Sequence, residues 1–420
     1  MLTILLLLLL FSLAFLRVPI AISIGFSSIF VLWLTGFSME TVILRMYTAT
    51  SKPLLMAVPG FVFAGILMAR GGIAKYLVEA MTAWIGHTRG GLSVIAVLTC
   101  LLFAAISGSS AATAVAVGSI MIPAMISAGY DKKYTMGLIS VAGTLGILMP
   151  PSIPLIIFGS IAEISVRDLF TAAIIPALLL SSMLIAFAII VARKKGYGGL
   201  EKVPLSKRWK PTGKAIWGFI FPILILGSIY GGFVTPTEAS FLSVLYALLI
   251  SFIVYREMDW KTFKQAVIDS VNTTAMIFLI IASASVFGMY LSLEQVPQTF
   301  ARWIVENDFN ALTFLLIVCL LLFVLGMFLD ATAMLLITLP IFLPILLLLD
   351  INLFYFAIIM VVTMEIGLIT PPLGMNLFVV SGITREKIES VIQGVLPFYF
   401  VFIFVLLLIV LFPQISLLLL

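Results

Sequence analysis

Residues 143–152 read Gly-Thr-Leu-Gly-Ile-Leu-Met-Pro-Pro-Ser, and residues 107–110 read Ser-Gly-Ser-Ser. Both runs interrupt sequence that is otherwise apolar. Proline lacks a backbone N–H and cannot continue a helix, so the doublet Pro150–Pro151 predicts a helix that breaks within a membrane. The small polar run predicts the turn of a hairpin, because the apolar arms on either side are short for a tilted membrane crossing.

A second copy of this pattern follows in the second half of the chain. The shift between the copies is 221 residues, the difference between Pro371 and Pro150. The clearest pairs in register are Pro150–Pro151 with Pro371–Pro372, Gly146 with Gly367, and Ser109 with Asp330. Paired broken helices in corresponding positions of two halves indicate a transporter site near the middle of the bilayer.

Composition limits the class of protein. The 420 residues are 63% hydrophobic and 10% charged, whereas a soluble domain is about one quarter charged. The chain is therefore an all-α polytopic membrane protein, and its longest polar stretch, 193–214, is too short for a soluble catalytic domain. His87 is the only histidine, and no zinc, P-loop or nucleophile motif is present, so we do not expect an enzyme. Cys100 and Cys319 lie in separate apolar segments and should be free thiols.

Apolar segments predict five membrane helices in each half. Their expected ranges are 2–16, 18–36, 54–70, 132–162 and 168–192, then 215–233, 236–256, 275–291, 353–383 and 392–412. Re-entrant hairpins are expected at 91–127 and 312–349, and interfacial helices at 39–52 and 258–272. We interpret the first 16 residues as a retained membrane helix, because no basic segment precedes them.

This organisation predicts two repeats of inverted topology. The first repeat is 1–192, with scaffold helices in 1–72 and transport elements in 90–192. A basic cytoplasmic linker occupies 193–214. The second repeat is 215–420, with scaffold helices in 215–292 and transport elements in 310–412.

Lysine and arginine predict the orientation. With the N-terminus outside, only Arg45, Lys52, Arg167 and Arg302 of the 23 basic residues lie outside, and the remaining 19, Arg17 among them, lie in the cytoplasm as the positive-inside rule requires. The first hairpin then enters from inside, and the second enters from outside, where Glu306, Asp308 and Asp350 flank it. Both termini are expected in the periplasm, and the basic linker is suited to anionic membrane lipid.

Three acidic residues fall within apolar spans: Glu238, Asp330 and Glu365. An acid at membrane depth is costly and is a functional candidate by default. Asp330 is the strongest candidate, because it lies at a hairpin tip. Glu365 lies one turn before the second break and suits a supporting carboxylate or a proton site. Glu238 follows Pro236, where it can simply favour the positive end of a helix.

Oxygen atoms near the tips and breaks suit a desolvated Na⁺. Carbonyls freed where a helix unwinds, together with hydroxyl groups, supply such ligands, and the N-termini of half-helices favour an anion. The candidates are Ala105, Ser107, Ser109, Ser110, Thr113, Gly143, Gly146, Met149 and Ser152 in the first half, and Gly326, Thr332, Gly367 and Thr370 in the second.

These motifs resemble the large membrane subunit (DctM or SiaM type) of tripartite ATP-independent periplasmic (TRAP) transporters. The most specific pieces are SGSSAATA at 107–114, GTLGILMPPSIP at 143–154 and GLITPPLGMN at 367–376. The resemblance covers nearly the whole chain. It implies the ion-transporter superfamily fold, with inverted repeats and an elevator mechanism. It also implies Na⁺-driven import of an organic anion, such as a C4-dicarboxylate, sialic acid or a related sugar acid, across the bacterial inner membrane.

The resemblance implies two protein partners as well. One is a periplasmic binding protein that delivers the substrate, and the other is a small four-helix membrane subunit of the DctQ or SiaQ type. Na⁺ is the coupling ion, and no other cofactor and no nucleic acid is expected.

By the same resemblance, specific residues take roles. The first sodium site would use Ala105, Ser107, Ser110, Gly143, Gly146 and Met149, and the second Gly326, Gly367, Thr370 and Leu373. Substrate would contact Ser109, Ser110, Ser152 and Asp330. Alternatives that stay open are a stand-alone Na⁺- or H⁺-coupled carboxylate carrier of the same superfamily, an intramembrane enzyme that uses Asp330 and Glu365, and a passive channel.

Overall fold

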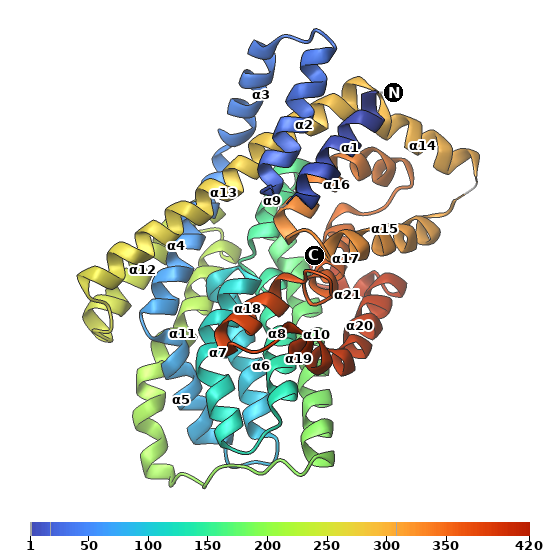
Figure 1. Ribbon diagram of the computed structural model, residues 1–420. Coiled ribbons are helices and arrows are strands. Elements are labelled where there is room, and N and C mark those ends of the chain that lie inside the picture. The colour runs from blue at the N-terminus through green and yellow to red at the C-terminus, as the bar shows by residue number, and fades with distance from the viewer. Residues whose placement is uncertain (1, 17, 308) are drawn as a thin grey trace.

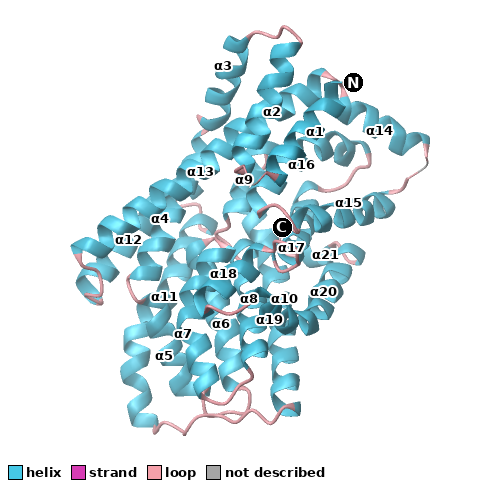
Figure 2. Ribbon diagram, viewed as in Figure 1, coloured by secondary structure: helices cyan, strands magenta, loops and turns pink. Residues whose placement is uncertain are grey.

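The structure is a computed structural model that describes residues 2–16, 18–307 and 309–420. Met1, Arg17 and Asp308 lie outside the described residues, as do the parts of the orientation argument that use Arg17 and Asp308. Within the described ranges every regular element is helical (Figures 1 and 2). Nine of these helices are long and apolar enough to cross a membrane. The chain is therefore a helical multi-pass membrane protein, as the composition predicts.

Ten α-helices lie in the described residues of the first half. They are α1 (Leu2–Phe15), α2 (Ile20–Leu34), α3 (Met39–Thr50), α4 (Ala57–Arg70), α5 (Ile73–Ile85), α6 (Gly91–Ser107), α7 (Ser110–Ser127), α8 (Lys132–Leu148), α9 (Ile153–Ala162) and α10 (Val166–Lys194).

The second half begins with α11 (Leu205–Tyr230), α12 (Pro236–Leu248) and α13 (Trp260–Leu293). It continues with α14 (Val296–Glu306), α15 (Ala311–Gly326), α16 (Ala331–Leu348), α17 (Leu353–Leu368), α18 (Met375–Thr384), α19 (Ile388–Val395), α20 (Tyr399–Leu411) and α21 (Gln414–Leu417). Short 3₁₀ turns precede α4 and α20, and a π-helical segment, Leu249–Val254, extends α12.

The predicted interruptions are present. Helices α6 and α7 form a hairpin that turns at 108–109, and α15 and α16 form a second one that turns at 327–330. Helices α8 and α9 are separated at 149–152, and α17 and α18 at 369–374. Both proline doublets therefore stop a helix, as their missing N–H groups predict.

Two expectations about the helices need correction. The segment 258–272 is not a separate interfacial helix, because it forms the start of the 34-residue helix α13. No proline or glycine occurs between Trp260 and Phe287, so nothing stops this helix, whereas Pro53 separates α3 from α4. The linker is also shorter than 193–214, because α11 begins at Leu205. Its first turns are held by Trp209, whose ring meets Trp84 edge-on at 5.7 Å.

The structure contains two amphipathic helices, α5 and α14, that the sequence analysis does not predict. They occupy equivalent places, each directly before a hairpin. Their tryptophans, Trp84 and Trp303, are the corresponding residues that mark these helices in the sequence.

The helices form two groups, and this arrangement positions the site. In one group α12 packs on α4, and α13 crosses α2, α3 and α4. In the other group α8 packs against α6, α7 and α19, and α17 against α15 and α20 (Figure 1). Helices α8 and α17 are buried along almost their whole length, which suits their apolar composition on every side. The hairpin tips lie where the second group meets α4 and α13.

Candidate substrate and ion site

The first hairpin tip is seated on the first helix break. A Cβ added to Gly146 would lie 2.3 Å from the carbonyl oxygen of Ser109, and one on Gly108 would lie 2.7 Å from that of Pro151. Gly108 also has a positive φ of 59°, which glycine adopts without steric cost. The N–H of Ile153 donates to the Gly108 carbonyl at 3.4 Å. Glycine is thus required for the backbone of the tip to reach the backbone of the break.

The second hairpin tip meets the second break in the same manner. A Cβ on Gly367 would lie 2.6 Å from the Cα of Gly326. The N–H groups of Leu373 and Gly374 donate to the carbonyl of Met327 at 3.1 and 3.3 Å. These bonds satisfy donors that the interruption of α17 leaves without helical partners, which lipid cannot satisfy.

The breaks release carbonyl oxygens. In an α-helix each carbonyl accepts from the N–H four residues later, and for Gly146 that residue is Pro150. The carbonyl of Gly367, whose partner would be Pro371, accepts instead from the N–H of Thr370 at 3.0 Å. The N–H of Ile153, which would pair with the carbonyl of Met149, donates to Gly108 instead. Such carbonyls are the ligands that Na⁺ takes in a broken membrane helix.

Within each of the two predicted sodium sites, the structure brings the named segments close to one another. The turns that carry Ala105, Ser107 and Ser110 lie against the end of α8, where Gly143 touches Ala114 and Gly146 touches Ser109. Gly326 touches Gly367, and the loop with Thr370 and Leu373 covers the end of α15.

A pocket of about 370 Å³ lies beside both tips. Its walls include Ser107 to Ala112 from the first hairpin and Asp330 to Thr332 from the second. Helices α4 and α13 close the opposite side through Val62, Gly65, Ile66, Thr273, Met276 and Ile277. The serine run and Asp330, 221 residues apart in sequence, therefore share one cavity.

Four helices begin at this pocket. Ser110, Ile153, Ala331 and Met375 are the first residues of α7, α9, α16 and α18, and all four line it. Helix N-termini carry partial positive charge and free N–H groups, so they attract anions. Among the described residues that line the pocket none is Lys, Arg or His, and Asp330 is its only charged residue.

Asp330 also has a structural task. Its Oδ2 accepts hydrogen bonds from the N–H groups of Thr332 and Ala333 at 3.0 and 3.4 Å, so it caps α16. Ser109 caps α7 in the corresponding way, through the N–H of Ala112 at 3.4 Å. The two tips therefore present equivalent caps with different charges.

Ser152 is not part of the pocket wall. Its hydroxyl is fully buried, donates to the carbonyl of Ile147 and accepts from the N–H of Leu155 at 3.4 Å. Its neighbours Ile153 and Pro154 line the pocket instead. Ser152 thus fixes the start of α9 rather than facing the cavity.

Asn376 is a site residue that the sequence reasoning missed. Ser110 Oγ donates to Asn376 Oδ1 at 2.8 Å, and Asn376 Nδ2 donates to the carbonyl of Ser140 at 2.9 Å. Asn376 is fully buried and joins the first hairpin, α8 and α18. The signal was available, because this amide is the last residue of the GLITPPLGMN run and lies in an apolar segment.

The other two intramembrane acids differ from Asp330. Glu365 is fully buried in α17, and neither carboxyl oxygen has a hydrogen-bond partner among the described residues. Glu238 is exposed and completes a capping box with Thr235, whose N–H donates to it at 2.8 Å. The interpretation of Glu238 as a helix-start residue is confirmed. Cys100 and Cys319 are both buried free thiols, as predicted.

Fold and site together define a polytopic membrane protein with a cavity built from two hairpin tips and two broken helices. Comparison of the backbone supports this class: the YdaH transporter of Alcanivorax borkumensis superposes with a TM-score of 0.65, 14% identity and coverage of 89% of this chain and 87% of that one. At this identity the similarity concerns the fold.

Comparison of the sequence identifies the family. The model of the DctM component of tripartite ATP-independent periplasmic transporters matches residues 7–415, and the chain belongs to this family. The C4-dicarboxylate TRAP transporter large permease protein DctM of Pseudomonas aeruginosa is 40% identical over 94% of this chain and 93% of its own. The sialic acid TRAP transporter large permease protein SiaM of Vibrio cholerae is 35% identical over 87% and 86%. These relatives are transporter permease subunits, so the chain is not an enzyme.

Proposed function

We propose that this chain imports an organic acid anion together with Na⁺, as the large membrane subunit of a three-part transporter in the bacterial inner membrane. The observation that carries the proposal is the convergence of four helix N-termini on one pocket that contains a single acid and no cationic side chain among its described lining residues. An anion placed there gains from the helix dipoles.

The acid in the pocket supports cation coupling. Asp330 would repel an anionic substrate at short range, and the repulsion is strong where water is excluded. Bound cations would offset this repulsion, and the carbonyls of Gly146 and Met149, which have lost their helical partners at the break, supply ligands for one of them. We place the first sodium ion among Ala105, Ser107, Ser110 and residues of α8, and the second among Gly326, Gly367, Thr370 and Leu373.

The relatives support the substrate class. Large permeases for C4-dicarboxylates and for sialic acid share 35–40% identity with this chain, and both substrates carry carboxylates. A pocket of about 370 Å³ falls in the range of small-molecule sites. We propose Ser109, Ser110 and Asp330 as the residues that contact substrate, with Asn376 holding Ser110 in place and Ser152 fixing the start of α9 beside them.

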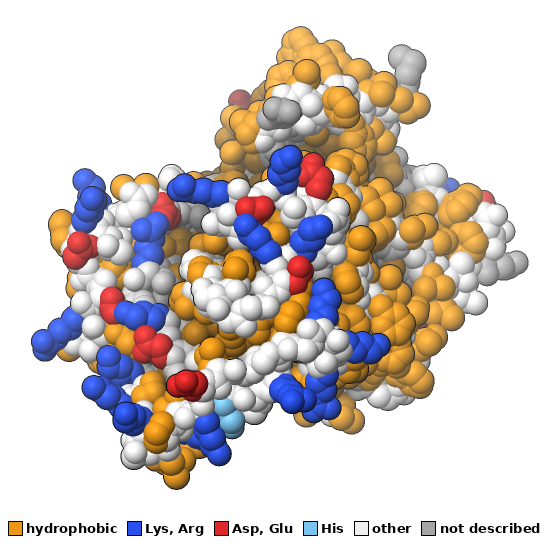
Figure 3. Space-filling view, turned by 60° about the horizontal axis from the view of Figure 1, so that its bottom comes forward, with side chains coloured by type: hydrophobic (Ala, Val, Ile, Leu, Met, Phe, Trp, Pro, Cys, Tyr) orange, Lys and Arg blue, Asp and Glu red, His pale blue; other side chains and the backbone are white. Residues whose placement is uncertain are grey.

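The mechanism and partners are part of the same proposal. The equivalent seating of each hairpin tip on a broken helix supports two inverted repeats. The division of the helices into a group around α4 and α13 and a group that holds both hairpins supports an elevator, in which the hairpin group moves along α4 and α13. The family description names a tripartite system, which supports a periplasmic binding protein and a small membrane subunit as partners. Basic side chains concentrate on the face where α10 ends and α11 begins (Figure 3). This concentration supports a cytoplasmic position for that face and periplasmic termini.

The test is uptake in proteoliposomes that contain the chain with both partners. Labelled C4-dicarboxylates and sialic acid serve as probes, and K⁺ replaces Na⁺ in the outer buffer at constant ionic strength. We expect uptake to require Na⁺ for one of these probes. Asp330→Ala should abolish uptake while the protein stays folded. Uptake that persists without Na⁺ and follows an imposed pH gradient would refute sodium coupling, and uptake without the binding protein would refute the tripartite assignment.

A further inference from the structure

A second cavity lies away from the hairpin tips, where α8 begins and α10 and α19 end. It has a volume of about 450 Å³. Lys133 and Tyr134 of α8, Lys194 and Lys195 at the end of α10, and Gln393 and Gly394 of α19 line it. Its position on the face with many basic side chains (Figure 3) corresponds to the cytoplasmic surface predicted by the distribution of Lys and Arg.

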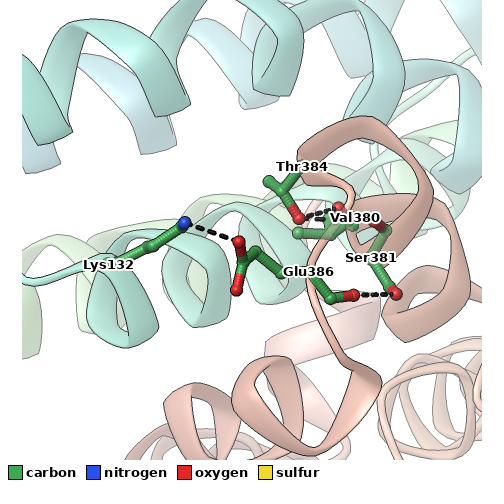
Figure 4. A network of polar contacts seen from close by, with 5 residues as sticks. All are labelled: Lys132, Val380, Ser381, Thr384 and Glu386. Carbon is green, nitrogen blue, oxygen red and sulfur yellow. Dashed lines mark hydrogen bonds and ion pairs between the residues drawn. The ribbon is translucent and has the colours of Figure 1, made fainter.

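The lysines of this cavity are available to a ligand. Lys133, Lys194 and Lys195 are exposed, and none forms an ion pair in the described part of the chain. The neighbouring Lys132 differs, because its Nζ lies 2.7 Å from a carboxyl oxygen of Glu386 (Figure 4). The one acid in the wall, Asp131, already accepts the N–H of Tyr134 at 2.8 Å as the cap of α8. The cavity thus carries three unpaired positive charges against one capping carboxylate.

The rest of the wall is aromatic and apolar. Phe187, Val191, Pro397 and Phe398 line it, and the rings of Phe187 and Phe398 meet edge-on at 5.3 Å. Behind them Tyr130 stacks on Tyr197 at 4.4 Å. Aromatic clusters of this kind occur at the level of lipid head groups. The cavity therefore lies where the membrane meets water.

Exposed apolar side chains lie next to the lining residues of the cavity along the chain. Ile190, on the same helix as Val191, is 51% exposed, and Phe400, two residues beyond Phe398, is 70% exposed. A soluble anion would need only the lysines, whereas a phospholipid would use the lysines for its phosphate and this apolar surface for its acyl chains. The combination distinguishes a lipid from a free anion.

The floor of the cavity explains its shape. A Cβ on Gly394 would lie 1.9 Å from the carbonyl oxygen of Lys133, and one on Gly137 would lie 2.1 Å from Gly394. Helices α8 and α19 therefore touch backbone to backbone, and Gly394 has no side chain that could extend into the cavity. A ligand there would contact α8 of the first half and α19 of the second.

We infer that this cavity binds the head group of an anionic phospholipid, such as phosphatidylglycerol or cardiolipin, from the cytoplasmic leaflet. Basic pockets between membrane helices on the cytoplasmic side are suited to such head groups. The bound lipid would join the two halves of the chain at α8 and α19. The inference concerns lipid alone and holds whichever substrate the transporter carries.

The experiment compares lipid binding by wild type and by the triple variant Lys133→Gln, Lys194→Gln, Lys195→Gln. The full chain in neutral detergent receives phosphatidylglycerol, cardiolipin or phosphatidylcholine, and native mass spectrometry and melting temperature report binding. We expect wild type to retain the anionic lipids selectively. We expect the variant to lose affinity on the order of a hundredfold, because each basic residue near an anionic surface contributes about 1 kcal/mol and 1.4 kcal/mol is a factor of ten.

Two further variants and one soluble probe control the result. Lys202→Gln, Lys207→Gln, Lys210→Gln makes the same charge change on the nearby linker and α11 and should bind as wild type does. Replacing the three cavity lysines by arginine keeps the charge and should retain binding, which separates loss of the site from loss of folding. Equal binding by wild type and the cavity variant, equal retention of phosphatidylcholine, or equal stabilisation by soluble glycerol phosphate would each overturn the inference.

Discussion

Gly146→Ala tests whether close contact between the first hairpin tip and the first break creates the ion site. The new Cβ would lie 2.3 Å from the Ser109 carbonyl oxygen, 2.6 Å from its carbon and 2.8 Å from the N of Ser110. All three are backbone atoms and cannot rotate away. Since ordinary contact begins at about 3.4 Å, the tip has to retreat by roughly 1 Å, and overpacking of this kind costs about 1–3 kcal/mol.

We expect this cost to appear in sodium affinity. The proposed ligands lie on both sides of the contact, so a tip that has moved away holds the ion less well. A loss of about 1–3 kcal/mol corresponds to a 5- to 150-fold rise in the Na⁺ concentration for half-maximal uptake. The measurement is the sodium dependence of uptake in proteoliposomes with both partners, together with the shift in melting temperature that Na⁺ produces in the purified chain.

The matched control is Gly382→Ala on α18. A Cβ there meets nothing within 4 Å, and alanine within a helix is favoured over glycine by up to about 1 kcal/mol. This variant should keep the sodium dependence of wild type. If Gly146→Ala also keeps it, the contact between tip and break does not form the ion site, and the reasoning is refuted.

Three other changes test separate parts of the structure. Asp330→Asn preserves size and an oxygen for the cap of α16 but removes the charge, so uptake should fall at least tenfold with little change in melting temperature; equal loss of both would indicate a purely structural role. Asn376→Leu leaves its buried partners unsatisfied and should lower the free energy of unfolding by about 1–3 kcal/mol, measured by denaturation. Glu257 accepts hydrogen bonds from Lys75 and from Tyr76, and these bonds, the one from Lys75 most, lower the pKa of its carboxyl group. Its contribution to stability is therefore complete above pH of about 4.5 and is lost as pH falls through the lowered pKa, and Glu257→Gln should remove this dependence at a cost of about 0.2–1 kcal/mol, because the ion pair is exposed.

The breaks and tips could be predicted because the sequence itself is incompatible with a continuous membrane helix at these positions. Pro150 and Pro371 remove the N–H four residues after Gly146 and Gly367, so a regular helix cannot continue there, whatever surrounds them. Likewise, an apolar segment that contains Ser-Gly-Ser-Ser or Asp330 cannot form an ordinary crossing without cost. Local chemistry decided these features, so reading them required no knowledge of tertiary contacts.

Other features depend on contacts between distant segments. Asn376 acquires its role only because Ser110 and Ser140 come to lie beside it, 266 and 236 residues away. The first turns of α11 are polar and look like linker until Trp209 meets Trp84. Ser152 looked like a ligand because it follows the prolines, yet its hydroxyl bonds to its own helix ends. Spacing in sequence identifies which residues are close to a break but not which direction a side chain takes.

The backbone bonds between tips and breaks also constrain how the molecule can move. Ile153 donates to Gly108, and Leu373 and Gly374 donate to Met327, so each hairpin tip satisfies donors that its broken helix exposes. An unsatisfied backbone group in lipid costs several kcal/mol. Separating a tip from its break would incur that cost at least once in the first half and twice in the second. We therefore expect each hairpin and its broken helix to move together, with displacement confined to their contacts with α4 and α13, where the pocket lies.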